Sequence, residues 1–158
     1  IDSDDLWGKH KLKRQINFME QNDYGFTYTY YETFGKKKKI ITPPERFTFA
    51  DFIRNTSIAT STMMVKKKIA EKTKFTDTKI CEDYFFKCKV LKKTKYAYCL
   101  KQFLTKYRIR NNSLQSSRIR NFYWIWVINR KYNKLNFLEN LLSLIFISFN
   151  SIKKYNLK

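Results

Sequence analysis

The chain has 158 residues, of which 43% are hydrophobic and 18% aromatic, so it can fold around a core and is not of the disordered class. Lysine and arginine outnumber aspartate and glutamate by 33 to 13, and the net charge of +20 favours nucleic acid, an anionic membrane or a phosphorylated ligand as a partner. With only three glycines and one histidine, a glycine-rich phosphate loop is excluded and zinc is disfavoured.

The positive charge has a second explanation, which the sequence leaves open. Lys, Asn, Ile, Tyr and Phe are abundant, and all are read from A/T-rich codons, so genome composition alone can make a surface rich in lysine. The lysine runs at 36–39, 66–68 and 92–93 are then solvated loops and helix ends. The three cysteines form no CxxC pair, so we expect buried thiols in a reducing compartment, the cytoplasm.

The chain opens on an acidic segment, Asp-Ser-Asp-Asp at 2–5, between Ile1 and Leu6-Trp7. Carboxylates this close repel one another, so a fold that keeps them together offsets the repulsion with a cation or leaves them in water. If a strand leads into Ile1, Asp2 and Asp4 project from the same side of the chain, an arrangement that Mg²⁺ accepts with water and phosphate oxygens completing its shell. A solvated acidic turn before the next helix is the alternative.

Five elements are predicted between residues 9 and 72. Leu12, Ile16 and Met19 recur at helical spacing and predict an amphipathic helix over 9–21 with a basic outer face. Thr48 is a candidate N-cap for a short helix within 47–53. The other patterns predict a strand over 24–31, a buried strand over 58–65 and a short helix over 66–72.

A second acidic pair, Glu82-Asp83, opens a helix predicted over 82–93. Carboxylates are favoured in the first turn of a helix, where they interact with the macrodipole or cap the end, and this is one interpretation of the pair. The other is that one of them is a general base, which takes a proton from a sugar or alcohol hydroxyl within hydrogen-bond reach.

The last third of the chain combines arginines with apolar helices. Two short strands are predicted over 96–100 and 103–109, and Arg108 at the second can pair with phosphate or remain an ordinary surface residue. Helices are predicted over 118–132 and 135–155. The apolar centre of the last helix, 141–149, is far shorter than the about 20 residues that span a bilayer, so it packs on the domain or lies in a membrane interface.

Taken in order, these segments resemble the C-terminal part of family-two glycosyltransferases of the GT-A fold. The stretch 1–19 is similar to the family's strand end, DxD-type motif and following helix, and 55–62 is similar to its acceptor-side strand. The tetrad Cys-Glu-Asp-Tyr at 81–84 resembles its acidic pair, and 107–114 resembles its Tyr-Arg-x-x-x-x-Ser segment. The resemblance runs from residue 1 to about residue 120 and implies an α/β fold with a mixed sheet, flanking helices and a C-terminal helical segment.

The resemblance also implies roles for individual residues. Asp4 and Asp2 correspond to the ligands of a divalent cation, Mg²⁺ or Mn²⁺, and Asp83 to the base, with Glu82 as a neighbour that tunes or orients it. Residues implied in binding the nucleotide sugar or the acceptor are Asp5, Trp7, Ser61, Tyr84, Arg108 and Ser113. The implied reaction inverts configuration, as the acceptor hydroxyl displaces the nucleoside diphosphate in one step.

The implied organisation is a C-terminal catalytic half over 1–115, on the metal and acceptor side, and a helical tail over 116–158 for which a membrane interface is one location. The family's N-terminal βαβ units, which bind the nucleotide, have no counterpart in the sequence, so we expect a fragment that is inactive alone and exposes a sheet edge. The implied partners are a nucleotide-diphosphate sugar, a glycan or lipid-linked acceptor in surface polysaccharide synthesis, and an anionic membrane surface. The implied location is the cytoplasm, including the inner face of the membrane.

Two other classes compete with the glycosyltransferase. A basic nucleic-acid-binding module would use the charge of +20 and interleaved aromatics such as Phe103, Tyr107 and Tyr123 to follow a phosphate backbone. It explains the charge but not the acidic segments, so no nucleic acid is expected as a partner. A membrane-bound remnant without activity would use the lysines and the apolar segment 141–149 to stay on anionic lipid.

Overall fold

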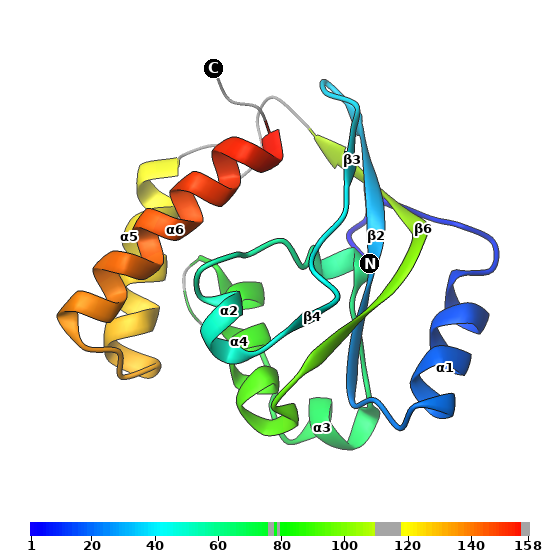
Figure 1. The fold of residues 1–158 in the computed structure, drawn as a ribbon, viewed down its shortest axis with the longest axis horizontal. Coiled ribbons are helices and arrows are strands. Elements are labelled where there is room, and N and C mark those ends of the chain that lie inside the picture. Colours follow the sequence, from blue (N-terminus) through cyan, green and yellow to red (C-terminus); the bar gives the residue numbers. More distant parts are fainter. Residues whose placement is uncertain (76–77, 79, 110–117, 156–158) are drawn as a thin grey trace.

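The structure is a computed structural model that describes residues 1–75, 78, 80–109 and 118–155; it forms one mixed sheet with helices on both sides (Figure 1). The strands are β1 (Leu6–Trp7), β2 (Phe26–Gly35), β3 (Lys39–Ile41), β4 (Arg46–Phe47), β5 (Met64–Val65) and β6 (Ala97–Ile109). The helices are α1 (Lys11–Gln21), α2 (Phe49–Phe52), α3 (Lys67–Glu71), α4 (Glu82–Thr94), α5 (Arg118–Val127) and α6 (Phe137–Tyr155). A 3₁₀ turn, η1, spans Thr60–Thr62, and a π-helical turn, η2 (Ile128–Tyr132), continues α5.

The two long strands β2 and β6 form the centre of the sheet and run parallel. The order is β1-β6-β2-β3, with β4 added to β6 and β5 to β2, and every pairing other than β2 with β6 is antiparallel. Residues Phe26 to Thr29 are all buried because helices cover both faces of β2. The mixed α/β architecture that we predicted is therefore confirmed.

The strands predicted over 96–100 and 103–109 are one continuous strand, β6. Its register against β2 shifts twice, because Thr29 pairs with Leu100, Tyr30 with Phe103 and Tyr31 with Thr105. Extra residues on one strand form bulges that break the two-residue alternation of inward and outward side chains. The bulge interrupts the sequence pattern, which is why the pattern predicts two strands where there is one.

Helix α1 forms where it was predicted, but it packs with an unexpected face. Lys11, Gln15 and Met19 are buried, whereas Leu12 and Ile16 are 49% and 42% exposed. The buried amide of Gln15 donates to Thr27 Oγ1 at 3.1 Å and to the Thr62 carbonyl at 3.0 Å. These hydrogen bonds satisfy polar groups that would otherwise be costly to bury, so they orient the helix against its hydrophobic pattern.

The prediction of a strand over 58–65 is wrong for most of that range. The range overlaps the acceptor-side segment 55–62. Residues 60–62 form the 3₁₀ turn η1, and only Met64–Val65 pair with β2. Thr62 bonds the Ala59 carbonyl twice, from its backbone N–H at 3.0 Å and its hydroxyl at 2.7 Å. Local bonds of this kind compete with strand pairing and favour a turn.

The predicted helix starts at α2 and α4 and the short helix α3 are confirmed. Thr48 caps α2 in a capping box, in which its hydroxyl accepts from the Asp51 N–H and the Asp51 carboxylate accepts from the Thr48 N–H. In α4 the pair Glu82-Asp83 occupies the first turn, as expected from the helix dipole. Two of the three cysteines, Cys88 and Cys99, are buried thiols as predicted.

Helices α5 and α6 share the core with the rest of the chain. Figure 1 shows them stacked outside α2 and α4, on the side away from α1. Ile125, Ile128 and Ile147 belong to the same buried cluster as Phe52 and Tyr84. No helix in the described part of the chain is long and apolar enough to cross a membrane.

A buried polar network joins α4 to the last helices. Asn129 is fully buried; its Oδ1 accepts from the Tyr84 hydroxyl at 2.8 Å and from the Asn133 amide at 3.1 Å. Its own amide donates to Ser143 Oγ at 3.1 Å, and Ser143 in turn donates to the Ile53 carbonyl. The network therefore fixes α5 and α6 on the domain through four elements at once.

Removing the centre of this network should destabilise the fold. Asn129→Ala leaves the Tyr84 hydroxyl and the Asn133 amide without their partner, and each unsatisfied buried group costs about 1–3 kcal/mol. We expect urea denaturation to show a loss of about 2–4 kcal/mol in the free energy of unfolding. The matched change Asn22→Ala, at an exposed position, should cost under about 0.5 kcal/mol; equal losses in the two variants would contradict the network.

Candidate active site

The acidic segment 2–5 is held against the turn η1. The Asp2 N–H donates to Ser61 Oγ at 3.0 Å, and the indole Nε1 of Trp7 donates to the Ser61 carbonyl at 2.7 Å. The side chain of one buried serine thus anchors Asp2, and its main chain anchors Trp7, just after the segment. The sequence separates Ser61 from Asp2 by 59 residues, so the contact is a product of the fold.

Arg108 closes the other side of the same segment. Its backbone N–H donates to Asp5 Oδ1 at 2.8 Å, and its guanidinium Nε donates to the Asp4 carbonyl at 3.0 Å, with the guanidinium 4.3 Å from the centre of the Phe34 ring. Arg108 was predicted to bind a ligand. These contacts hold the acidic segment in place, and the ligand-binding role of Arg108 stays a prediction.

Asp83 lies on the first turn of α4 in an ion pair that was not predicted from the sequence. Its Oδ2 accepts from the Lys87 ammonium at 2.8 Å and from the Thr60 hydroxyl at 3.0 Å, while the Lys87 side chain is only 4% exposed. Cys81, directly before the helix, adopts a left-handed backbone with φ of 63°. Such a conformation is uncommon for a residue with a side chain and occurs where tertiary contacts impose it.

The turn η1 brings the two acidic motifs near each other, since Asp2 bonds Ser61 and Asp83 bonds Thr60. Burial raises the pKa of Asp2, and the carboxylates of Asp5, Asp83 and Asp4 raise it further against the opposing effect of the N-terminal ammonium. For Asp83, burial acts to raise the pKa, but the Lys87 ammonium and the hydrogen bonds from Lys87 and Thr60 hold it below its ordinary value. Asp83 is therefore an anion at neutral pH.

The fold brings most of the predicted site residues together. Asp2, Asp4, Asp5, Trp7, Ser61, Asp83 and Arg108 are linked by the contacts and charges described above. Tyr84 is an exception, because it is buried in the core with its hydroxyl on Asn129 and so does not face a ligand. Glu82 is exposed beside Asp83, and Ser113 lies outside the described residues.

Lys87, Thr60 and Lys11 were not predicted as site residues. The spacing of Asp83 and Lys87, four apart on one helix, was the available signal for the ion pair. Lys11 is buried, donates to Gln15 Oε1 at 2.8 Å and lies 4.2 Å from the centre of the Trp7 ring, and burial lowers its pKa to about 8. Nothing in the local pattern marks Lys11, because a lysine on an apparent outer face is expected to be solvated.

The acidic segment fits a hard divalent cation, although within the described residues no group of three or more histidine, cysteine or carboxylate side chains could hold a metal ion by itself. Asp5 Oδ2 is buried with no hydrogen-bond partner among the described residues, and the crowding around Asp2 raises the pKa of that carboxyl. Mg²⁺ binds to one or two carboxylates together with phosphate oxygens and water. The donor set is therefore suited to a cation that a phosphorylated ligand helps to bind.

This crowding has a measurable consequence for stability. Because the pKa of Asp2 is raised in the folded state, its ionised form opposes folding above that pKa, and stability is recovered as the pH falls through it. Asp2→Asn should therefore raise the urea midpoint at pH 7, and the gain should vanish at acidic pH, where the wild-type carboxyl is protonated. Adding Mg²⁺ should reduce the difference in urea midpoint between the variant and the wild type at pH 7. A lower midpoint for Asp2→Asn at pH 7 without cation would contradict repulsion among these carboxylates.

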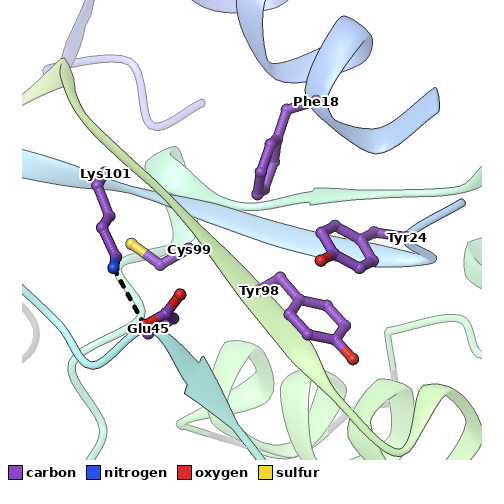
Figure 2. Close-up of a pocket in the computed structure, with 6 residues that line it drawn as sticks. All are labelled: Phe18, Tyr24, Glu45, Tyr98, Cys99 and Lys101. Carbon is purple, nitrogen blue, oxygen red and sulfur yellow. Dashed lines mark ion pairs between the residues drawn. The ribbon is translucent and has the colours of Figure 1, made fainter. Parts of the chain in front are cut away.

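Two hollows lie near the sheet, and neither is lined by Asp2, Asp4 or Asp83. One, of about 490 Å³, runs along β1 and β6 and includes Trp7. The other, of about 300 Å³, contains the stacked rings of Tyr24 and Tyr98, whose centres are 3.7 Å apart, and the ion pair of Lys101 with Glu45 (Figure 2). Because Tyr24 and Tyr98 cover each other, we interpret this second hollow as surface packing beside β6.

Together, the mixed sheet and the two acidic motifs beside the turn η1 define an α/β chain with an anionic site. Comparison with known proteins finds that the chain is similar to glycosyltransferases. The chain is 28% identical to the putative teichuronic acid biosynthesis glycosyltransferase TuaG of Bacillus subtilis, over 98% of this chain and 63% of TuaG. It is 26% identical to WfgD of Escherichia coli, a UDP-Glc:alpha-D-GlcNAc-diphosphoundecaprenol beta-1,3-glucosyltransferase, over 96% of this chain and 59% of WfgD.

Solved structures show the same fold. S. aureus TarS 1-349 in complex with UDP-GlcNAc superposes with a TM-score of 0.62 at 16% identity, covering 97% of this chain and 48% of TarS. No family model matches the chain. The chain spans about three fifths of the length of the curated relatives TuaG and WfgD, 63% and 59%.

Proposed function

We propose that this chain is the metal and acceptor side of a family-two, GT-A glycosyltransferase, which moves a sugar from a nucleotide-diphosphate sugar to an acceptor hydroxyl in surface glycan synthesis. The observation that carries the proposal is the meeting of Asp2 and Asp83, about eighty residues apart, around the turn η1. The names of TuaG and WfgD support a transferase, and WfgD's name supports a lipid-linked acceptor. Transfer of a hexose is part of the same proposal.

Asp83 is the proposed general base. Its side-chain bonds, from Lys87 and Thr60, both go to Oδ2, and the Tyr84 backbone N–H also bonds the carboxylate, so its position is fixed. An acceptor hydroxyl bonded to this anion can pass its proton to the carboxylate as its oxygen attacks the anomeric carbon. The attack comes from the face opposite the leaving nucleoside diphosphate, so the configuration inverts. Glu82, exposed beside Asp83, is the proposed neighbour that tunes or orients Asp83.

Asp4 and Asp2, with Asp5 in support, would hold the cation and the sugar diphosphate. A bound Mg²⁺ or Mn²⁺ supplies charge stabilisation at the leaving diphosphate. Ser61 and Trp7 hold the segment at one side and Arg108 at the other, so the carboxylates stay in place without a ligand. Such preorganisation favours the transition state because little reordering is needed when the donor binds.

A transfer assay tests this proposal. The protein as the cell makes it is incubated with nucleotide-diphosphate sugars, Mn²⁺ and a saccharide on a lipid diphosphate, and release of nucleoside diphosphate is followed. We expect release that needs both acceptor and cation, and a product whose anomeric configuration is opposite to the donor's. Release that is independent of the cation, or a product with retained configuration, would overturn the assignment of Asp4 or of Asp83, respectively.

A further inference from the structure

The outward face of helix α6 is apolar, unlike that of an ordinary surface helix, while its inward face combines polar side chains with the core residue Ile147. Its inward face carries Asn140 and Ser143, both fully buried, where Ser143 donates to the Ile53 carbonyl and the Asn140 amide to the Trp126 carbonyl at 3.1 Å. Its outward face carries large apolar side chains that are 40–67% exposed, among them Leu138, Leu141, Leu142, Ile145, Phe146 and Phe149. A surface helix in water normally presents polar side chains on its outward face.

These apolar side chains form a continuous strip, since positions 138, 141, 142, 145, 146 and 149 follow helical spacing. Contiguous apolar surface of this kind marks a site of interaction with a protein or a membrane. The strip extends along most of the 19 residues of α6. The charges around the strip distinguish between these two kinds of partner.

The charges around the strip are almost all positive. Between residues 118 and 155 the sequence has seven lysines and arginines and a single acidic residue, Glu139. Arg130, Lys131 and Lys134 are exposed just before α6, and Lys153 is exposed near its end. A second copy of the chain would bring like charges together on the same face, whereas an anionic bilayer offers apolar depth and complementary charge.

We propose that the outward face of α6 docks on an anionic phospholipid bilayer, with the helix lying in the plane of the interface. The apolar strip enters the boundary between headgroups and acyl chains, while the flanking lysines contact anionic headgroups. The docking does not depend on the proposed catalytic residues, since none of them lies on α6. It would place a transferase beside a lipid-linked acceptor, which links this proposal to the proposed function without resting on it.

The test is co-sedimentation with vesicles, using the protein as the cell makes it and no nucleotide sugar. We expect binding to phosphatidylcholine vesicles that contain about 30% phosphatidylglycerol, and much weaker binding to phosphatidylcholine alone. Leu138→Gln with Phe149→Gln, at side chains 66% and 67% exposed, should weaken binding at least about tenfold. The control Leu12→Gln with Ile40→Gln, at exposed sites away from α6, should leave binding unchanged.

A second pair of variants tests the charges. Lys131→Glu with Lys134→Glu should weaken binding by at least about fivefold for each lysine, whereas Lys9→Glu with Lys13→Glu should change it little. Circular dichroism checks that each variant keeps its helices. The proposal is overturned if the protein does not co-sediment, if the α6 variants bind as well as their controls, or if they instead abolish a dimer that forms without lipid.

Discussion

Asp83→Asn should lower the rate of sugar transfer by about 10²–10⁴, the contribution typical of a general base, while binding of the nucleotide sugar stays nearly intact. The change keeps the shape of the side chain and its place beside Thr60 and Lys87, but an amide cannot accept the acceptor's proton. Turnover and donor affinity should therefore respond differently: kcat falls, and the Kd for the donor stays nearly unchanged. Steady-state kinetics and calorimetry measure the two quantities.

The matched control is Glu20→Gln, the same chemical change at an exposed position of α1. It should leave turnover unchanged. Because Asp83→Asn also removes the charged partner of the buried Lys87 ammonium, the thermal stability of the variant has to be measured alongside. Near-normal turnover of a folded Asp83→Asn protein would refute the base assignment.

Asp4→Ala should weaken cation-dependent binding of the nucleotide sugar by about a hundredfold, because the carboxylate is the proposed ligand of the cation. Arg108 Nε bonds the main-chain carbonyl of Asp4, which alanine retains, so the segment should keep its position. Calorimetric titration at several Mn²⁺ concentrations measures the effect. Ser3→Ala, in the same turn, is the control that should bind normally; equal losses in both variants would point to the turn and not to a cation ligand.

The sequence predicted the parts of the fold that local pattern determines. The N-cap at Thr48, the acidic first turn of α4 and the first part of strand β2 all follow from neighbouring residues. The predictions from the sequence failed where the packing depends on residues that are distant in the chain. Gln15 turns α1 against its hydrophobic pattern through bonds to Thr27 and Thr62, and Thr62 makes a turn where β-branched residues suggested a strand.

The candidate site divides in the same way. The acidic motifs could be found from residue type and spacing, and the fold places Asp2 and Asp83 on neighbouring residues of the turn η1, Ser61 and Thr60. The partners of the polar side chains could not be found: Arg108 bonds the acidic segment, Tyr84 faces Asn129, and the buried Lys87 pairs with Asp83. Each depends on which side of a helix or strand faces the core, and a single sequence does not define that side.

The most direct measurement of the central claim is a pair of titrations on the protein as the cell makes it. One measures binding of a nucleotide-diphosphate sugar with and without Mn²⁺. The other measures binding of RNA and DNA at increasing salt concentration, because the charge of +20 also suits a nucleic-acid-binding module. We predict donor binding that needs the cation and is lost in Asp4→Ala. Tight, salt-sensitive binding to nucleic acid with no response to Mn²⁺ and nucleotide sugar would contradict the account.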